Sequence, residues 1–246
     1  MTQGKQYVRP PIDEAVVELL FEPGPAWDGT EAGKLQSELS ASYPSKALTQ
    51  GLFSLSLSPP GNAIPFVPQA TTRTLLPDLD GKRMVGVAPN VLTVHELAPY
   101  GGWDDFSGRV QEALTAYWKV TQPIGVRRLR IRYINRIVVP STKVDLDEYF
   151  TAAPRLPAGI EGHLRNFITR IEQPFEDGSV MVMTLAPAPA GAPEQESAFV
   201  LDFDLVRVFE TATAAVSAMA ALEELRTRER AAFEAMITDA TRRLFV

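Results

Sequence analysis

Hydrophobic and polar residues alternate along much of the chain with a period of two, which is typical of strands that bury one face. The clearest case is Phe53, Leu55 and Leu57, which are separated by single serines. Strands are expected over residues 12–21, 53–58, 73–76, 82–88, 91–96, 126–139, 164–173, 179–185 and 199–209. Asp80-Gly81 and Asp177-Gly178 each join two of these strands, and such dipeptides tolerate the positive φ of a tight hairpin turn.

Other stretches repeat apolar residues every three to four positions, which indicates helices with one buried stripe. One helix is expected to begin at Asp28 and to end before Pro44, with Leu35 and Leu39 on its stripe. Further helices are expected from residue 104 to before Pro123, over residues 145–150 and at the carboxyl end, where residues 214–225 bend into a final helix with an apolar stripe over 232–244.

The order of these elements is similar in the two halves of the chain, residues 1–123 and 124–246. Each half has a strand, a helix or helical turn, a set of strands with an Asp-Gly hairpin, and a long helix. We therefore expect an α+β fold, mainly antiparallel, with long helices packed on one side of the sheet or sheets. A duplicated unit and a non-repetitive fold with a coincidentally similar order both fit this pattern, and the halves can pack as a single domain.

Composition narrows the class of protein. The chain of 246 residues is 45% apolar, which is enough to bury a core, and its formal net charge of −6 argues against duplex DNA as a partner. It has no cysteine, which excludes disulfides, zinc–thiolate sites and cysteine nucleophiles. No apolar run reaches the length of a membrane span, and the first one is interrupted by Glu18, unlike a signal peptide. A cytoplasmic location without membrane contact is expected.

The sharpest local feature is a predicted strand with five arginines between residues 127 and 136. Side chains of a strand alternate between its faces, so four of these arginines share one face: Arg128, Arg130, Arg132 and Arg136. Neighbouring charges on this face lie roughly 7 Å apart and repel each other by about 2.4 kcal/mol at an effective dielectric constant of about 20. The strand therefore needs counter-charges.

Two sources of counter-charge predict different functions. Asp202 and Asp204 alternate in the same way on another predicted strand, and they would form an ion-pair ladder with the arginines, which is a structural role. Glu14 and Glu18 on the first strand could add to this ladder. Alternatively, the guanidinium groups bind an external anion such as a nucleotide, a single RNA strand or the acidic face of a protein.

A second candidate is the turn from Leu97 to Trp103, which has two glycines and the aromatic residues Tyr100 and Trp103 before a predicted helix. Backbone amides at a helix start can hold an anion, so this turn is either a ligand loop or only the entry to the helix. His95 and His163 lack metal-ligand neighbours, and the sequence has no phosphate-binding loop, dinucleotide fingerprint or nucleophile elbow. No metal site and no cofactor are therefore predicted.

Four segments resemble a sporadically distributed bacterial family of similar length: Pro10-Pro11-Ile12-x-Glu14-Ala15-Val16-Val17-Glu18, Leu97-Ala98-Pro99-Tyr100, Arg132-Tyr133-Ile134-Asn135-Arg136-Ile137, and a terminal helix with Phe233. The family is described by its distribution, so the resemblance implies a cytoplasmic bacterial setting but no activity and no catalytic residues. A patchy distribution is compatible with defence, toxin-neutralising or mobile-element roles.

The leading hypothesis is a non-enzymatic binding or regulatory module that recognises an anionic ligand or a protein partner through the four arginines, Tyr100 and Trp103. One alternative is a metal-independent RNA-processing or phosphoester-cleaving enzyme with the candidate residues Arg128, Arg132, Tyr133, Asn135 and His163. Another is a structural subunit of an oligomer that docks through the apolar stripe of its terminal helix.

Overall fold

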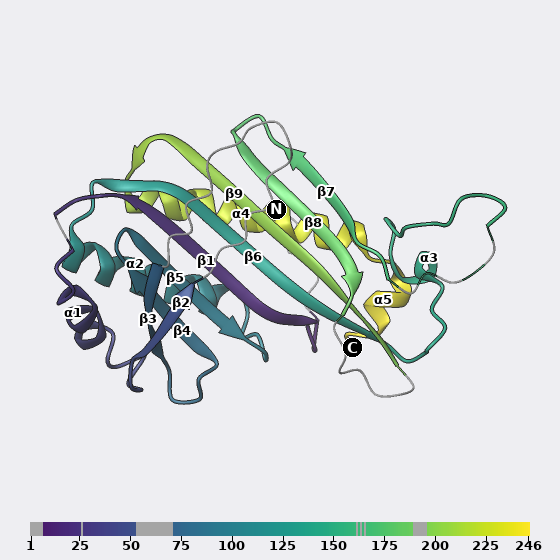
Figure 1. The fold of residues 1–246 in the computed structure, drawn as a ribbon, viewed down its shortest axis with the longest axis horizontal. Coiled ribbons are helices and arrows are strands. Elements are labelled where there is room, and N and C mark those ends of the chain that lie inside the picture. Colours follow the sequence, from purple (N-terminus) through teal and green to yellow (C-terminus); the bar gives the residue numbers. More distant parts are fainter. Residues whose placement is uncertain are drawn as a thin grey trace.

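The computed structural model describes residues 7–25, 27–52, 71–160, 162, 164, 166–188 and 196–246. These residues form an antiparallel sheet of nine strands in the order β2-β3-β4-β5-β1-β6-β9-β8-β7, together with five helices (Figure 1). The strands are β1 (Ile12–Glu22), β2 (Leu48–Leu52), β3 (Thr71–Pro77), β4 (Arg83–Ala88), β5 (Val91–Leu97), β6 (Gly125–Val139), β7 (Thr169–Pro174), β8 (Ser179–Pro187) and β9 (Ser197–Thr213). The helices are α1 (Glu31–Glu38), α2 (Trp103–Thr121), α3 (Leu146–Tyr149), α4 (Ala215–Met236) and α5 (Asp239–Arg243).

The first strands of the two halves, β1 and β6, pair with each other at the centre of the sheet, with Val17 opposite Ile131. In each half the first strand also pairs with the last strand of a meander, which gives the orders β1-β5-β4-β3-β2 and β6-β9-β8-β7. The fold is therefore α+β and antiparallel, and both halves belong to one sheet.

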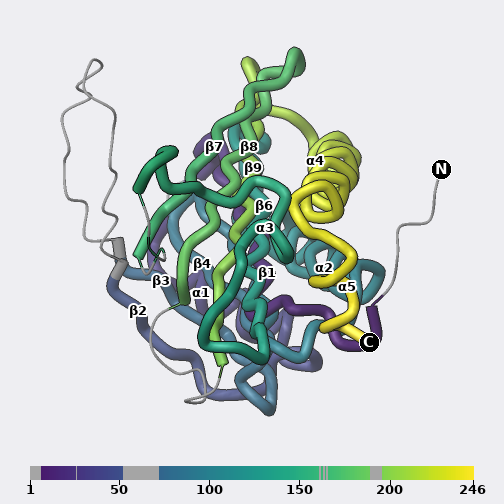
Figure 2. The backbone as a smooth tube through the Cα atoms, turned by 90° about the vertical axis from the view of Figure 1, so that its right-hand side faces the viewer, coloured from purple at the N-terminus to yellow at the C-terminus, as the bar shows by residue number. Residues whose placement is uncertain are grey.

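Alternation along the central strands separates two faces of the sheet. On one face, which we call the covered face, Val17, Ile131 and Phe203 are all buried. Phe21 of β1 stacks on Tyr117 of α2 with ring centroids 4.5 Å apart, and Phe203 of β9 lies 6.1 Å from Phe233 of α4. Figure 2 shows α4 beside β6 and β9.

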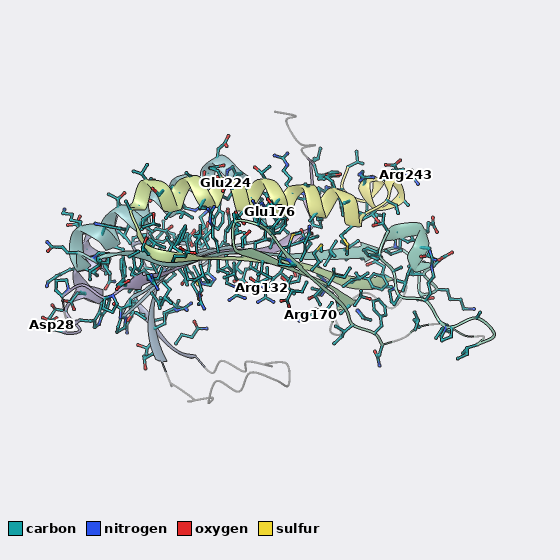
Figure 3. All side chains as sticks on the ribbon, turned by 90° about the horizontal axis from the view of Figure 1, so that it is seen from above. Asp28, Arg132, Arg170, Glu176, Glu224 and Arg243 are labelled. Atoms are coloured by element: carbon teal, nitrogen blue, oxygen red, sulfur yellow. The ribbon has the colours of Figure 1, made fainter. Side chains whose placement is uncertain are left out.

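The opposite face, which we call the open face, carries the half-buried residues that alternate with this core. Figure 3 shows α4 on one side of the sheet and Arg132 on the other. The residues of the open face in the central strands include Glu14, Val16, Glu18, Arg128, Arg130, Arg132, Ile134, Arg136, Asp202, Asp204 and Val206.

The carboxyl-terminal helices differ from the prediction. No bend follows residue 225, because α4 continues to Met236 and buries residues that include Leu222, Leu225 and Phe233. The predicted final helix is broken at Ile237, which is extended and bridges Phe150. A short helix, α5, then starts after Thr238, whose side chain accepts a hydrogen bond from the Thr241 amide. The apolar stripe of α4 faces β6 and β9 and is therefore not free for docking.

Two strand predictions also differ in extent. The strand expected over residues 53–58 lies outside the described residues, and β2 ends at Leu52. The strand expected from residue 164 begins only at Thr169. The hairpin glycines Gly81 and Gly178 have φ values of +66° and +77°, which confirms the turn conformation that their dipeptides predicted. Across the described ranges, no helix combines the length and apolar character that crossing a membrane requires.

Candidate functional site

The arginines of β6 form side-on ion pairs with aspartates of β9. Nε and Nη2 of Arg130 each donate to Asp204 at 2.7 Å, and the same atoms of Arg132 donate to Asp202 at 2.9 and 2.7 Å. The register places Arg132, and not Arg130, directly opposite Asp204. Each arginine therefore reaches diagonally to the aspartate that lies opposite the residue two positions further along β6. The internal source of counter-charge, expected from the alternation of both strands, is therefore present.

A glutamate of β1 completes this network on the other side of β6. Glu18 lies opposite Arg130, accepts a hydrogen bond from Nη2 of Arg128 at 2.6 Å, and lies 3.6 Å from Nη2 of Arg73. Arg73 comes from β3 and crosses β4 at Gly86, where an added Cβ would lie 2.6 Å from Arg73 Cδ. The close approach of Arg73 therefore depends on a glycine at this position.

The guanidinium groups keep one edge exposed, although they are paired. We call Arg128, Arg130 and Arg132 the arginine row. Their side chains are 41%, 32% and 37% exposed, whereas the carboxylates that pair with them are 15%, 24% and 14% exposed. The hydrogen bonds of the row to described residues use Nε and Nη2 only, so no Nη1 atom of the row donates to a described residue. The carboxylates thus hold the guanidinium groups from below and leave their outer edges accessible.

Two further properties of these cations bear on binding. The hydrogen bonds that Arg130 and Arg132 donate to Asp204 and Asp202 raise the pKa of both guanidinium groups above the ordinary value, so both stay charged. Arg136 lies at the end of the same face, and its side chain has no ion pair with any residue in the described ranges. With Arg73, five arginines share this part of the open face with four carboxylates (Glu14, Glu18, Asp202 and Asp204), which leaves one positive charge in excess.

A carboxylate–histidine–hydroxyl chain lies beside the arginine row. Nδ1 of His95 is 3.0 Å from Glu14, and Nε2 is 3.1 Å from Oγ1 of Thr93. This order of groups is that of a catalytic triad. Thr93 is only 1% exposed, however, and its Oγ1 also accepts a hydrogen bond from Arg73 at 3.1 Å. A substrate cannot reach this hydroxyl, so Glu14, His95 and Thr93 belong to the hydrogen-bond network around Arg73.

The second predicted candidate, the turn before α2, lies on the covered face. The hydroxyl groups of Tyr100 and Tyr133 are 2.9 Å apart, and Nε1 of Trp103 donates to Glu223 of α4 at 2.8 Å. The amide of Gly101 donates to Glu96 at 3.1 Å, and this buried carboxylate is also paired with Arg109. An internal carboxylate thus occupies the anion position that the sequence suggested, and the turn is a helix entry.

The sheet separates the predicted residues into two groups. Tyr133 alternates with Arg132, so Tyr100 and Trp103 lie on the face opposite to the arginine row. The enzyme candidates are divided in the same way, because Tyr133 and Asn135 are buried on the covered face and Asn135 donates to the Leu201 carbonyl at 3.0 Å. His163 lies outside the described residues.

The sequence patterns did not predict an ion pair that is buried on α4. Arg226 and Glu229 pair with each other beneath the helix, and the guanidinium carbon of Arg226 lies 4.3 Å from the centre of the Tyr133 ring. Burial raises the pKa of the Glu229 carboxyl above its ordinary value, and the neighbouring guanidinium opposes this effect. The signal in the sequence was the helical spacing of both residues with Leu222, Leu225 and Phe233 on one stripe.

A cavity of about 1020 Å³ lies beside α3, away from the arginine row. Its lining includes Phe199, which belongs to the covered face, and Arg155, whose Nε already lies 3.0 Å from Asp147. Among the residues that the structure describes, no three histidine or acidic side chains are grouped to hold a metal ion. The arginine row differs from this cavity in that adjacent carboxylates hold its accessible cationic groups in place.

Comparison with known proteins gives no relative from which a role can be transferred. The chain matches no family model, and neither a curated protein nor a solved structure is significantly similar to it.

Proposed function

We propose that the protein is a non-enzymatic binding module whose arginine row recognises an acidic segment of a protein partner. The observation that carries the proposal is the side-on pairing of Arg130 and Arg132, which fixes each guanidinium group and leaves its Nη1 edge exposed. A fixed guanidinium group loses little conformational entropy when it binds a carboxylate, so the internal ladder supports recognition.

The side chains around the row favour a protein over a nucleic acid. Half-buried Val16, Ile134 and Val206 lie between the charged residues of the open face. The aromatic residues of the central strands, such as Phe21, belong to the covered face. Single-stranded nucleic acids are usually bound by aromatic side chains that stack on the bases. An aliphatic surface with cationic groups therefore suits an acidic peptide better than it suits nucleic-acid bases.

The spacing of the row fits the same ligand. Alternate side chains of any extended strand are roughly 6.6 Å apart, and the arginines of the row are alternate residues of β6. An extended acidic segment therefore presents a carboxylate to each arginine in turn. Its intervening side chains then point away from the row, because the side chains of an extended segment alternate between its two sides.

Two structural inferences belong to this proposal. We infer that the long helices α2 and α4 cover the same face, because the residues they contact, Phe21 and Phe203, belong to it, and that this leaves the open face for a partner. We also infer a duplication, because β1-β5-β4-β3 and β6-β9-β8-β7 follow the same order, to which the first half adds β2 at its edge. Membership of the sporadically distributed bacterial family and a cytoplasmic location remain predictions.

The test uses an octapeptide of alternating glutamate and valine. A lysine–valine octapeptide serves as the control of opposite charge. Calorimetric titration of the full chain is expected to show binding of the glutamate peptide and none of the lysine peptide. Arg130→Gln/Arg132→Gln is expected to weaken binding at least about tenfold, because it removes charge-assisted hydrogen bonds worth about 1.5–3 kcal/mol each. The free energy of unfolding should fall by about 1 kcal/mol per half-exposed ion pair.

The matched control is Asp202→Asn/Asp204→Asn, which breaks the same two ion pairs but keeps both arginines. This variant loses the carboxylates that hold the guanidinium groups, but it also loses their repulsion of the peptide. Its binding of the glutamate peptide is therefore expected to weaken less than that of Arg130→Gln/Arg132→Gln. Equal binding of both peptides by the wild type contradicts the proposal, as does equal loss of binding in the two double variants. Binding of a single-stranded oligonucleotide in preference to the glutamate peptide would indicate a phosphate ligand and would also overturn the proposal.

A further inference from the structure

The strand β7 forms one edge of the described sheet and pairs there only with β8 (Figure 1). Its residues from Arg170 to Pro174 are exposed, and Ile171 remains 37% exposed. Ile168, just before the strand, is 76% exposed. A free edge with exposed apolar side chains can pair with a strand of another chain.

The hydrogen-bonding direction of each residue follows from the hairpin. The amide of Phe175 donates to the Ser179 carbonyl at 2.8 Å, so alternate residues before it, such as Ile171, direct their backbone groups toward β8. Arg170 and Glu172 then direct their N–H and C=O groups away from the sheet. Pro174, which has no N–H group, has the same outward direction, where its missing donor breaks no bond with β8.

The sequence of this edge is self-complementary in one register. If two copies pair antiparallel around Ile171, Arg170 of each copy lies opposite Glu172 of the other, and the two residues exchange backbone hydrogen bonds. A register centred on Arg170 or on Glu172 would place like charges opposite each other. The charges thus select the register centred on Ile171.

In this register, each face of the sheet in one copy also lies beside the same face in the second copy. Ile171 lies beside Met183, which is buried on the covered face, so a pair of Ile171 side chains would extend the apolar layer. On the other face, Nη2 of Arg170 lies 3.3 Å from Oε2 of Glu172 in the same chain. In the proposed register, Arg170 also lies within reach of Glu172 of the second copy.

We propose that two copies of this chain associate through antiparallel pairing of their β7 edges about Ile171, which joins their sheets into one. A contact between two short strands is smaller than the standard interface, so we expect a weak, concentration-dependent dimer. The arginine row lies on β6 and is not part of this interface, so the two proposals can fail independently.

A single cysteine provides the first test, because the chain has none of its own. In this register Ile171 forms a non-hydrogen-bonded pair, whose Cα atoms lie about 4.5 Å apart, within the range that a disulfide spans. Under mild oxidation, Ile171→Cys is expected to give mostly disulfide-linked dimer on a non-reducing gel. The control is Val216→Cys on α4, at a position that is 82% exposed. If the two variants cross-link to the same extent, the proposed interface is wrong.

A charge exchange provides the second test. In sedimentation equilibrium over a series of concentrations, Glu172→Arg is expected to weaken the dimer by about tenfold or more, because it places arginines opposite each other. Arg170→Glu/Glu172→Arg is expected to restore the wild-type association, since the pairs are complementary again. Both side chains are more than half exposed, so folding should not change. A wild type that stays monomeric, or a double variant as weak as Glu172→Arg, would overturn the proposal.

Discussion

At the residue scale, the absence of a side chain at Gly86 brings Arg73 into the network of the open face. Arg73 passes over this glycine to donate to Thr93 and to approach Glu18. A methyl group at Gly86 would overlap Oγ1 of Thr93 and lie 2.6 Å from Cδ of Arg73. The ion-pair network therefore depends on a position that has no charge of its own.

Gly86→Ala should lower the free energy of unfolding by about 1–3 kcal/mol, the usual cost of inserting a methyl group into a packed site. Urea denaturation of both proteins measures the difference. Gly108→Ala is the matched control, because Gly108 lies in the middle of α2 with nothing within 4 Å of an added Cβ. There alanine should be neutral or stabilising. Equal effects of the two substitutions would show that the passage over Gly86 is not tight.

Asp177, in the β7–β8 hairpin, is expected to make stability depend on acid pH. Its carboxylate accepts a hydrogen bond from Arg228 at 3.0 Å and others from Ser179, and chiefly the bond from Arg228 holds its pKa well below the ordinary value. A depressed carboxyl pKa stabilises the fold above about pH 4, where the unfolded group is ionised, and this contribution is lost as the pH falls further.

Asp177→Asn should therefore lower the free energy of unfolding at pH 7 by about 1–2 kcal/mol. The difference from the wild type should narrow steadily below about pH 4. Urea denaturation of both proteins at several pH values between 7 and 2 measures it. A difference that stays constant over this range would show that the ionised carboxylate does not supply the stability.

At the element scale, α4 combines an apolar stripe with the buried pair of Arg226 and Glu229. Arg226→Met should cost about 3–5 kcal/mol, because it leaves Glu229 buried without this partner. Arg226→Met/Glu229→Leu should recover most of the loss, since no uncompensated carboxylate remains. Thermal and urea unfolding of the two variants provide the measurement. A double variant that is as unstable as Arg226→Met would mean that the pair itself holds α4 on the sheet.

Local patterns predicted most elements because strand and helix periods depend only on neighbouring residues. The alternation of β6 and β9 also predicted that Asp202 and Asp204 can pair with the arginines. The diagonal choice of partner was not predictable, since it depends on the register between distant strands. The break at Ile237 has the same kind of cause, because its bridge to Phe150 is a long-range contact.

At the scale of the whole molecule, the sheet decides which candidate residues can act together. The sequence placed Arg132 and Tyr133 on opposite faces, but it gave no information on the face that Tyr100 would contact. The structure places Tyr100 against Tyr133, while Glu96 occupies the anion position beside it. Pairing of β1 with β6, which fixes all of these positions, involves residues more than 100 positions apart and follows from no local pattern.

In the proposed function, the arginine row binds through its exposed edges while the aspartates hold it in place. Nuclear magnetic resonance of the arginine Nε–Hε groups, during titration with the glutamate–valine octapeptide, measures this directly. We predict saturable shifts for Arg128, Arg130 and Arg132, and unchanged signals for Arg226, which is buried on the covered face. Unchanged signals from the arginine row, or equal shifts for all exposed arginines, would contradict the claim.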